Sequence, residues 1–375
     1  MNGRALLVSS LLATGAAAQS VCPARDVWPD GDWQQQPVTG KDAAIAELES
    51  YAFTLEGELY GRKGLHTNGL VVIHRGVLVY ERYARGFSAD NRHLSWSVAK
   101  SVSSALVGIA ARDGLLHPDD SVCAHLPEYE GTEACGITVK HAITFATGLD
   151  WVEDYENGNY QTSSVLSMLF GVGSGDQLRH ILTHRFSARP GQQWRYSTGD
   201  AALASAVAKR ALEKKYGADP FWPALFDVIG MRDVVVEQDV KGTPLGGSCV
   251  YATPREFAKF GYLFLNDGCW NGTRVLPEGW VAASTTPSEA FVDFGTAADQ
   301  YPSGYSWWLG VPVPERQVPS RWPDVPADTF AAQGHWGQRI IVVPSEDLVV
   351  VRVGDDREEP MNTNDLLKRV LEVVR

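Results

Sequence analysis

A serine and a lysine three residues apart are the residues of this sequence whose types and spacing most directly suggest chemistry. Ser97 and Lys100 form a Ser-x-x-Lys pattern within the stretch from Leu94 to Gly114. Residues three apart on a helix lie on one side of it, so the amine would lie beside the hydroxyl. A desolvated lysine loses proton affinity and can take the proton of a serine that attacks a carbonyl. Residues 97–100 are therefore a candidate nucleophile motif.

The stretch that holds this motif has the pattern of an amphipathic helix. Gly114 stands where a helix C-cap is expected. The apolar residues recur at helical spacing: Val98, Val102, Ala105, Leu106 and Ile109. Ser97 would lie at the helix N-terminus, where backbone N–H groups and the helix dipole favour a developing anion. The alternative is an N-capping serine beside a solvated lysine. About one such match is expected by chance in a chain of this length, so the motif needs further support.

A tyrosine further along the chain could supply part of that support. Tyr196 lies in the stretch Trp194–Thr198, just before an alanine-rich helix expected over Ala201–Lys215. At a helix start its hydroxyl could point into a cleft, and a neighbouring lysine cation would lower the pKa of the phenol. The alternative is an aromatic residue that anchors the core.

A third stretch, Gly334–Gln338, begins a β-rich hairpin near the C-terminus. Its sequence is Gly-His-Trp-Gly-Gln. Glycines here would let the backbone approach a ligand closely, so that strand N–H groups could face a substrate. The alternative is a plain turn at the entry to a strand.

The elements that must position these residues are strands near both ends and helices between them. Strands are expected over residues 70–73 and 77–83 as a hairpin, and again over residues 339–343 and 348–353. Helices are expected over 41–51, 254–265 and 364–375, and helical patterns dominate 115–232. The segment 301–329 is rich in Pro and Trp, and we expect a loop there that is a candidate for lining a site. The economical architecture is α+β, an antiparallel sheet built from both termini with an all-helical insertion.

Composition and the N-terminus indicate an exported globular protein. Of the 375 residues, 44% are hydrophobic and 21% charged, which is typical of a soluble globular chain. The formal charge of −12 argues against nucleic acid or an anionic membrane surface as a partner. Residues 1–18 have the pattern of a signal peptide, with Arg4, a short apolar run and an Ala-Ala-Ala site. We therefore expect a secreted or periplasmic protein with no membrane span.

Five cysteines fit an oxidising compartment. Cys123 and Cys135 bracket a short loop and are the expected disulfide, while Cys249 and Cys269 could pair with each other or either could pair with Cys22. The sequence has no C-x-x-C, no metal-ligand spacing of histidines, and no G-x-S-x-G, H-E-x-x-H, G-x-x-x-x-G-K or G-x-G-x-x-G motif. A Ser-His-Asp triad stays open, because its members need not be neighbours in sequence.

Taken together, the three stretches resemble the serine hydrolase superfamily of class C β-lactamases, D-Ala-D-Ala carboxypeptidases, family VIII carboxylesterases and 6-aminohexanoate-dimer hydrolases. S-V-A-K, Y-S-T and H-W-G match its three motifs in order, and residues 137–151 and 246–277 extend the likeness over most of the chain from about Leu70. The resemblance implies a β-lactamase/transpeptidase-like fold. We expect a discontinuous α/β domain over 19–105 and 245–375 and a helical domain over 106–244.

The resemblance also implies roles for particular residues. Ser97 would form an acyl-enzyme, and Lys100 and Tyr196 would share the general-base role and later protonate the leaving group. The backbone N–H groups of Ser97 and Gln338 would form the oxyanion hole. The third motif would place His335, Trp336 and Gly337 against the substrate. Tyr155 lies in a stretch like the G-L-D-W-x-E-D-Y of 6-aminohexanoate-dimer hydrolases, where a tyrosine contacts the substrate amide. No metal or cofactor is implied.

Two departures from the motifs of β-lactamases bear on the substrate. His335 stands where β-lactamases have a lysine that helps bind the carboxylate of the antibiotic, and Trp336 makes the cleft bulkier. Thr198 replaces an asparagine in the second motif, and we expect the donor and acceptor capacity of the amide to be lost. We therefore predict a hydrolase of a small ester or amide with little activity on β-lactams. The alternatives are a D-amino-acid peptidase acting on cell-wall fragments and a non-catalytic penicillin-binding-type protein.

Overall fold

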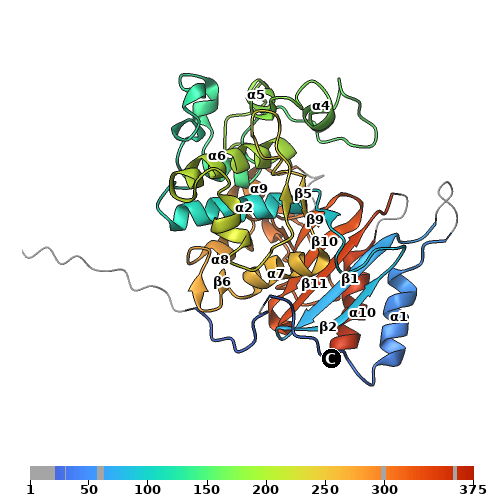
Figure 1. The fold of residues 1–375 in the computed structure, drawn as a ribbon. Coiled ribbons are helices and arrows are strands. Elements are labelled where there is room, and N and C mark those ends of the chain that lie inside the picture. Colours follow the sequence, from blue (N-terminus) through green and yellow to red (C-terminus); the bar gives the residue numbers. More distant parts are fainter. Residues whose placement is uncertain (1–21, 30, 57–62, 297–300, 358–360) are drawn as a thin grey trace, which may run out of the picture.

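A six-stranded antiparallel sheet brings the two ends of the chain together (Figure 1). The computed structural model describes residues 22–29, 31–56, 63–296, 301–357 and 361–375, so the signal peptide expected over 1–18 lies outside the described residues. The strand order is β2-β1-β11-β10-β9-β8. The bounds are Thr67–His74 (β1), Val77–Tyr83 (β2), Trp308–Leu309 (β8), Phe330–Gly334 (β9), Gln338–Val343 (β10) and Leu348–Gly354 (β11). β1 pairs directly with β11, with Val71 opposite Val351.

Helices cover both faces of this sheet, which is why its central strands are almost continuously apolar. Side chains on one face of β1, β10 and β11 pack with α1 (Asp42–Ala52) and α10 (Thr363–Val374). Side chains on the other face pack with α2 (Val98–Arg112) and α7 (Pro254–Leu265). Figure 1 shows α1 and α10 together on one side of the strands. A strand buried on both faces gains from apolar residues at every position.

The nucleophile motif lies at the start of α2, which packs along α6 (Thr198–Tyr216). The alanines of α6 are buried, and small side chains let two helices approach closely. The remaining helices of this part are short: α3 (Val139–Ile143), α4 (Ser164–Phe170), α5 (Gln177–Leu182), the 3-10 turns Val122–Ala124, Pro127–Tyr129 and Glu133–Gly136, and a π-turn at Trp222–Phe226. Residues 115–232 are thus less helical than expected, because much of the segment is connecting loop.

Smaller elements join the sheet to these helices. A three-stranded sheet has the order β3-β5-β4, and a separate hairpin pairs β6 with β7. The bounds are His93–Leu94 (β3), Val235–Val236 (β4), Val250–Ala252 (β5), Cys269–Trp270 (β6), Thr273–Arg274 (β7), Trp280–Ser284 (α8) and Glu289–Phe294 (α9). The segment 301–329 is mostly loop, as expected, although β8 adds a short sixth strand to the sheet edge.

Local sequence signals explain where several elements begin and end. α7 begins at Pro254 behind a capping box in which the side chains of Thr253 and Glu256 each bind the other's backbone N–H. The turn between β1 and β2 has Arg75 and Gly76 at φ 52° and 81°. Such left-handed residues give the tight hairpin turn that the sequence predicted.

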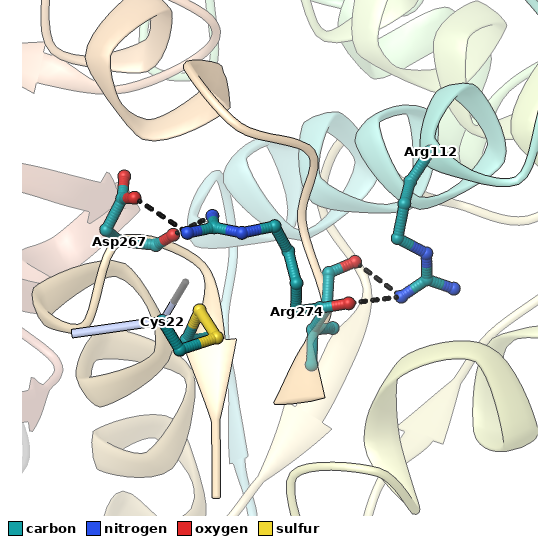
Figure 2. Close-up of a disulfide and its surroundings, with 6 residues drawn as sticks. Cys22, Arg112, Asp267 and Arg274 are labelled. Atoms are coloured by element: carbon teal, nitrogen blue, oxygen red, sulfur yellow. Dashed lines mark hydrogen bonds and ion pairs between the residues drawn. A yellow bond between two sulfur atoms is a disulfide. The ribbon is translucent and has the colours of Figure 1, made fainter. Parts of the chain in front are cut away.

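Two disulfides staple the chain. Cys123 pairs with Cys135, as expected. Of the pairings that the sequence left open for the other three cysteines, the structure has Cys22 with Cys269. Cys249 is unpaired and buried. Figure 2 shows the second disulfide beside Arg274, which donates to the carbonyl and carboxylate of Asp267. Arg112, at the end of α2, donates to the carbonyls of Arg274 and Val275. The N-terminal segment is thereby tied to the far end of the helix that carries the motif.

In the part of the chain that the structure describes, no helix is both long enough and apolar enough to cross a membrane.

Candidate active site

The hydroxyl of Ser97 stands at the N-terminus of α2 without capping it. Ser97 occupies the N-cap position, but its side chain makes no capping hydrogen bond. The residue before it, Trp96, has a φ of 47°, which is uncommon for a residue with a bulky side chain. The alternative of an N-capping serine does not describe this geometry.

Lys100 is buried directly beneath that hydroxyl. Its Nζ lies 2.9 Å from the Oγ of Ser97, 2.7 Å from the Oγ1 of Thr198 and 2.8 Å from the carbonyl oxygen of Gly247. Only 2% of the residue is exposed, so a solvated lysine is also ruled out. All three contacts are neutral oxygens, and no carboxylate touches the amine among the described residues. Burial lowers the pKa of Lys100 to about 8, although the charges of Glu153 and Asp200 partly oppose this.

Tyr196 lies against the same pair. The Nζ of Lys100 is 4.9 Å from the centroid of its ring, and the ring also packs against Phe145 and Trp308 at 5.0 and 5.2 Å. The expectation that the lysine would lower the pKa of this phenol is wrong. Burial, reinforced by the negative charge of Glu153, raises the pKa of Tyr196 well above 10, and the hydrogen bond with Ser97 opposes this only in part. The phenol is therefore protonated at neutral pH.

Thr198 keeps the two hydrogen-bonding roles that we expected to be lost from the second motif. Its hydroxyl accepts from Lys100 and donates to the carboxylate of Glu153. A threonine hydroxyl is both a donor and an acceptor, so it can replace the amide here. Glu153 also accepts from the backbone N–H of Thr198 at 2.9 Å and from the indole of Trp151 at 2.6 Å. This carboxylate thus links the loop 150–160 to the start of α6.

The third motif forms a tight turn between β9 and β10 that comes very close to the nucleophile. A Cβ on Gly334 would lie 2.2 Å from the carbonyl oxygen of Ser95, so only glycine allows this approach. Gly337 has a φ of 91°, and its carbonyl accepts from the buried guanidinium of Arg352 at 3.0 Å. Gln338 begins β10 directly after the turn, and its side chain binds Gly354 on β11.

An aromatic cluster surrounds this turn. The ring of His335 stacks on Tyr155 at 4.8 Å, and Trp96 packs edge-on against Tyr155, His335 and Trp336. The carboxylate of Glu156 accepts from the ring nitrogens of His335 and Trp336 at 2.9 and 3.2 Å. Burial lowers the pKa of His335, with Glu156 opposing this, and burial raises the pKa of Tyr155 above its usual value.

A pocket of about 320 Å³ opens over Ser97. Of the residues expected from sequence, it is lined by Ser97, Tyr196, Tyr155 and His335, whereas Lys100, Trp336, Gly337 and Gln338 lie outside its lining. Seven further residues line it: Glu153, Tyr301, Trp308, Arg321, Gln333, Gly334 and Arg339.

Sequence reasoning named none of Glu153, Arg321, Gln333 and Arg339 as site residues. Two signals could have found some of them. The stretch that contains Tyr155 also contains Glu153, and the loop 301–329, expected as a candidate for lining a site, contains Arg321. The other two come from β9 and β10, and only the fold brings them to the pocket.

Among the residues that the structure describes, no cluster of three or more His, Cys, Asp or Glu side chains is arranged to hold a metal ion.

Known proteins share this sequence and fold. The profile of the Beta-lactamase family matches residues 54–375. A 6-aminohexanoate-dimer hydrolase from Paenarthrobacter ureafaciens is 25% identical over 285 residues, covering 73% of this chain and 70% of that protein. A proposed 6-aminohexanoate-dimer hydrolase from Bacillus anthracis has a solved structure with a TM-score of 0.70 at 18% identity, covering 93% of this chain and 89% of that one.

A family VIII carboxylesterase has the same fold, with a TM-score of 0.65 at 15% identity over 91% of this chain and 98% of that one. Because the family profile matches most of the chain and the three motifs meet at one pocket in the expected fold, the chain belongs to the beta-lactamase family of serine hydrolases.

Proposed function

We propose that this protein is a serine hydrolase that cleaves a small ester or amide through an acyl intermediate on Ser97. The observation that carries the proposal is the buried amine of Lys100, 2.9 Å from the serine hydroxyl. Because burial brings the pKa of Lys100 to about 8, an appreciable fraction of the amine is neutral near neutral pH and can accept a proton.

In the first half-reaction, the neutral amine of Lys100 takes the proton of the Ser97 hydroxyl as the oxygen attacks the carbonyl carbon. The carbonyl oxygen becomes an anion, which the backbone N–H groups of Ser97 and Gln338 would stabilise. The protonated phenol of Tyr196 donates its proton to the leaving oxygen or nitrogen, and the bond to the leaving group breaks. The tyrosinate left behind regains a proton from the ammonium of Lys100.

In the second half-reaction, water attacks the acyl-serine ester. Lys100 accepts one proton of the attacking water, directly or through Tyr196. That proton then passes to the serine oxygen as its bond to the acyl carbon breaks. The acid product leaves and the site returns to its starting state. We assign the base role chiefly to Lys100, because the pKa of the Tyr196 phenol is held well above 10.

Little activity on β-lactams is part of the same proposal. His335 occupies the position of the anion-binding lysine, and burial lowers its pKa. Its ring nitrogen already contacts the carboxylate of Glu156. The antibiotic's carboxylate would therefore find no cation at that position.

Turnover of 4-nitrophenyl butyrate, with the 6-aminohexanoate dimer as an amide substrate, tests the proposal. We expect wild type to hydrolyse the ester and Ser97→Ala to lose at least 10³-fold in kcat. Ser104→Ala is the matched control, since Ser104 lies on the same helix and its buried hydroxyl has no hydrogen-bond partner among the described residues. Ester hydrolysis that persists in Ser97→Ala would overturn the assignment.

We also propose that the protein is exported. Two disulfides support an oxidising compartment, and residues 1–18 have the pattern of a signal peptide. N-terminal sequencing of the protein recovered from its native host should begin near residue 19. An intact N-terminus in the cytoplasmic fraction would contradict export.

A further inference from the structure

Exposed apolar side chains gather beside α4 and α5, which Figure 1 shows at the outer edge of the molecule. Tyr160 and Phe170 are 59% and 56% exposed, and Val172 and Val240 are 92% and 86% exposed. They come from the loop before α4, the end of α4 with the turn that follows it, and the turn after β4. Single exposed apolar residues are ordinary, whereas a group of them marks an interaction site. We call these four residues the apolar patch.

Close approaches bring the four side chains into one surface. A Cβ on Gly171 would lie 3.4 Å from the Cβ of Tyr160, so the tyrosine lies over the turn that follows α4. A Cβ on Gly175 would lie 4.0 Å from the Cγ2 of Val240, so this valine borders the other end of the same turn. The patch is therefore continuous across segments that are far apart in the sequence.

The surface around the patch carries no net charge. From Asn157 to Gly175 the sequence has no Asp, Glu, Lys, Arg or His, although 21% of the whole chain is charged. The turn that holds Val240 adds Asp239 and Lys241, whose charges cancel. The chain as a whole has a formal charge of −12, so an anionic membrane or a second copy of this chain would repel it. An uncharged apolar surface on an acidic protein fits an uncharged partner.

The apolar patch and the candidate active-site pocket share one loop. Glu153 and Tyr155 line the pocket, and Tyr160 belongs to the patch. The chain from Tyr155 to Tyr160 spans at most about 18 Å when fully extended, so the patch begins close to the pocket wall. Tyr301, which also lines the pocket, is itself 47% exposed. A surface that touches the patch therefore lies near the opening of the pocket.

We propose that the apolar patch docks the enzyme on an uncharged, water-insoluble ester, so that the pocket takes its substrate from the surface of an emulsion droplet. Contact with the droplet removes the four exposed side chains from water, and this burial drives the docking. The inference rests on the proposed hydrolase function and specifies the physical form of its substrate.

Tributyrin, an uncharged ester of limited solubility, tests the docking. We expect the wild-type rate to rise at least fivefold when tributyrin passes from the dissolved to the emulsified form. In Val172→Ser/Val240→Ser this rise should be lost, because both exposed side chains become polar. The kcat/KM of this variant for dissolved 4-nitrophenyl butyrate should stay within twofold of wild type, since neither valine lines the pocket. An unchanged rise in the variant would overturn the proposal.

Val228→Ser/Val235→Ser is the matched control. These valines are 38% and 39% exposed, and they lie after the π-turn and on β4, outside the apolar patch. The control should keep the wild-type rise on emulsified tributyrin. If both double variants lose the rise equally, exposed valines in general and not the patch are responsible, and the proposal is wrong.

Adsorption to droplets separates this inference from the proposed function. Ser97→Ala should be depleted from the water phase when tributyrin droplets are removed by centrifugation, whereas Ser97→Ala/Val172→Ser/Val240→Ser should stay in solution. If adsorption depends on the two valines while wild type hydrolyses no ester, the docking surface stands and the proposed function is wrong. If dissolved esters are hydrolysed while both proteins adsorb alike, the docking surface is wrong and the proposed function stands.

Sedimentation velocity and binding to phosphatidylglycerol vesicles test the other occupants of the patch. We expect wild type to be a monomer that does not bind these vesicles. A dimer that is lost in Val172→Ser/Val240→Ser would assign the patch to a second copy of the chain. Vesicle binding that is lost in the same variant would assign it to a membrane, and either result would overturn the proposal.

Discussion

The chemistry of the candidate site depends on how one amine is desolvated. Lys100 is surrounded by neutral oxygens from Ser97, Thr198 and Gly247, and the largest opposing influence on its pKa is the charge of Glu153. A lysine that touched a carboxylate would keep its proton at neutral pH and could not serve as a base. The hydroxyl of Thr198 stands between Lys100 and Glu153, so the carboxylate stays one residue away from the amine.

The pH dependence of acylation should report this desolvation. Because only the neutral amine accepts the serine proton, kcat/KM for a neutral 4-nitrophenyl ester should rise with pH and level off above the pKa of Lys100, about 8. No fall is expected up to pH 10, since the pKa of the Tyr196 phenol lies well above that value. A rate that is flat from pH 6 to pH 9 would argue against Lys100 as the base.

Glu153 should set the position of that rise. Its negative charge favours the protonated form of Lys100, so Glu153→Gln should lower the pKa of Lys100 and move the rise in kcat/KM toward lower pH. Glu156→Gln changes the same charge on the same loop, but Glu156 contacts His335 and Trp336 instead. The midpoint in that control should stay where it is in wild type. A midpoint that moves equally in both variants would mean that loop charge in general, not Glu153, tunes the amine.

At the level of single residues, sequence reasoning predicted which groups would meet but not what their surroundings would do to them. Ser97, Lys100 and Tyr196 were expected together because three motifs occur in order. The pKa of Tyr196 was predicted in the wrong direction, because the extent of its burial and the position of Glu153 follow from packing that no local pattern encodes. Arg321 was not named at all, since an arginine in an irregular loop has no characteristic spacing.

Among the elements, the end of β9, beside the short edge strand β8, positions the site most tightly. Gly334 ends β9 against the backbone of Ser95, two residues before the nucleophile. Arg352 on β11 binds the carbonyl of Gly337 and forms a fully buried ion pair with Asp356. The turn that presents Gln338 is thus held from β11 as well as from its own strands.

Gly334→Ala tests this close approach. The added Cβ would lie 2.2 Å from the carbonyl of Ser95, so the turn before Ser97 or the end of β9 must move. We expect a loss of about 10²-fold in kcat, comparable to the loss of one oxyanion donor. Gly136→Ala is the control, because its Cβ would meet only Pro190 at 3.8 Å and its backbone is not left-handed. Wild-type kcat in Gly334→Ala would show that the approach of β9 is not needed for catalysis.

Secondary structure was predictable where the signal was long or capped. α7 matches its expected bounds because Pro254 and a capping box define its start, and the two hairpins follow from β-rich runs joined by tight turns. The segment 115–232 was predicted less well. Its short helices and 3-10 turns have too few residues for a helical period to be distinguished from loop.

At the scale of the whole molecule, the chain passes from the six-stranded sheet into the helices around α6 and returns to the sheet. These two parts meet at α2. The helix lies between the sheet and α6, so its N-terminus opens where both parts contribute side chains. Long-range pairing of β1 with β11 brings residues from both ends of the chain into one sheet, as the positions of the predicted strands indicated. Which of the cysteines would pair with Cys22 was not predictable, because the choice depends on where the N-terminal segment runs.

The two disulfides should contribute unequally to stability. Cys22 and Cys269 are 247 residues apart, whereas Cys123 and Cys135 are 12 apart. By loop-closure entropy, removing the first should cost about 5 kcal/mol and removing the second about 3 kcal/mol. Denaturant unfolding of Cys22→Ser/Cys269→Ser and Cys123→Ser/Cys135→Ser measures both costs. Equal costs, or a larger cost for the short loop, would mean that local native contacts outweigh chain entropy here.

The proposed chemistry requires the hydroxyl of Ser97 to be the nucleophile. Labelling of wild type with a fluorophosphonate, followed by peptide mass spectrometry, tests it most directly, since the reagent reacts with activated serines. We expect one adduct per molecule, on the peptide that contains Ser97, with labelling lost in Ser97→Ala, retained in Ser104→Ala and slowed at least tenfold in Lys100→Met. An adduct on another residue, or equal labelling of the Ser97→Ala protein, would contradict it.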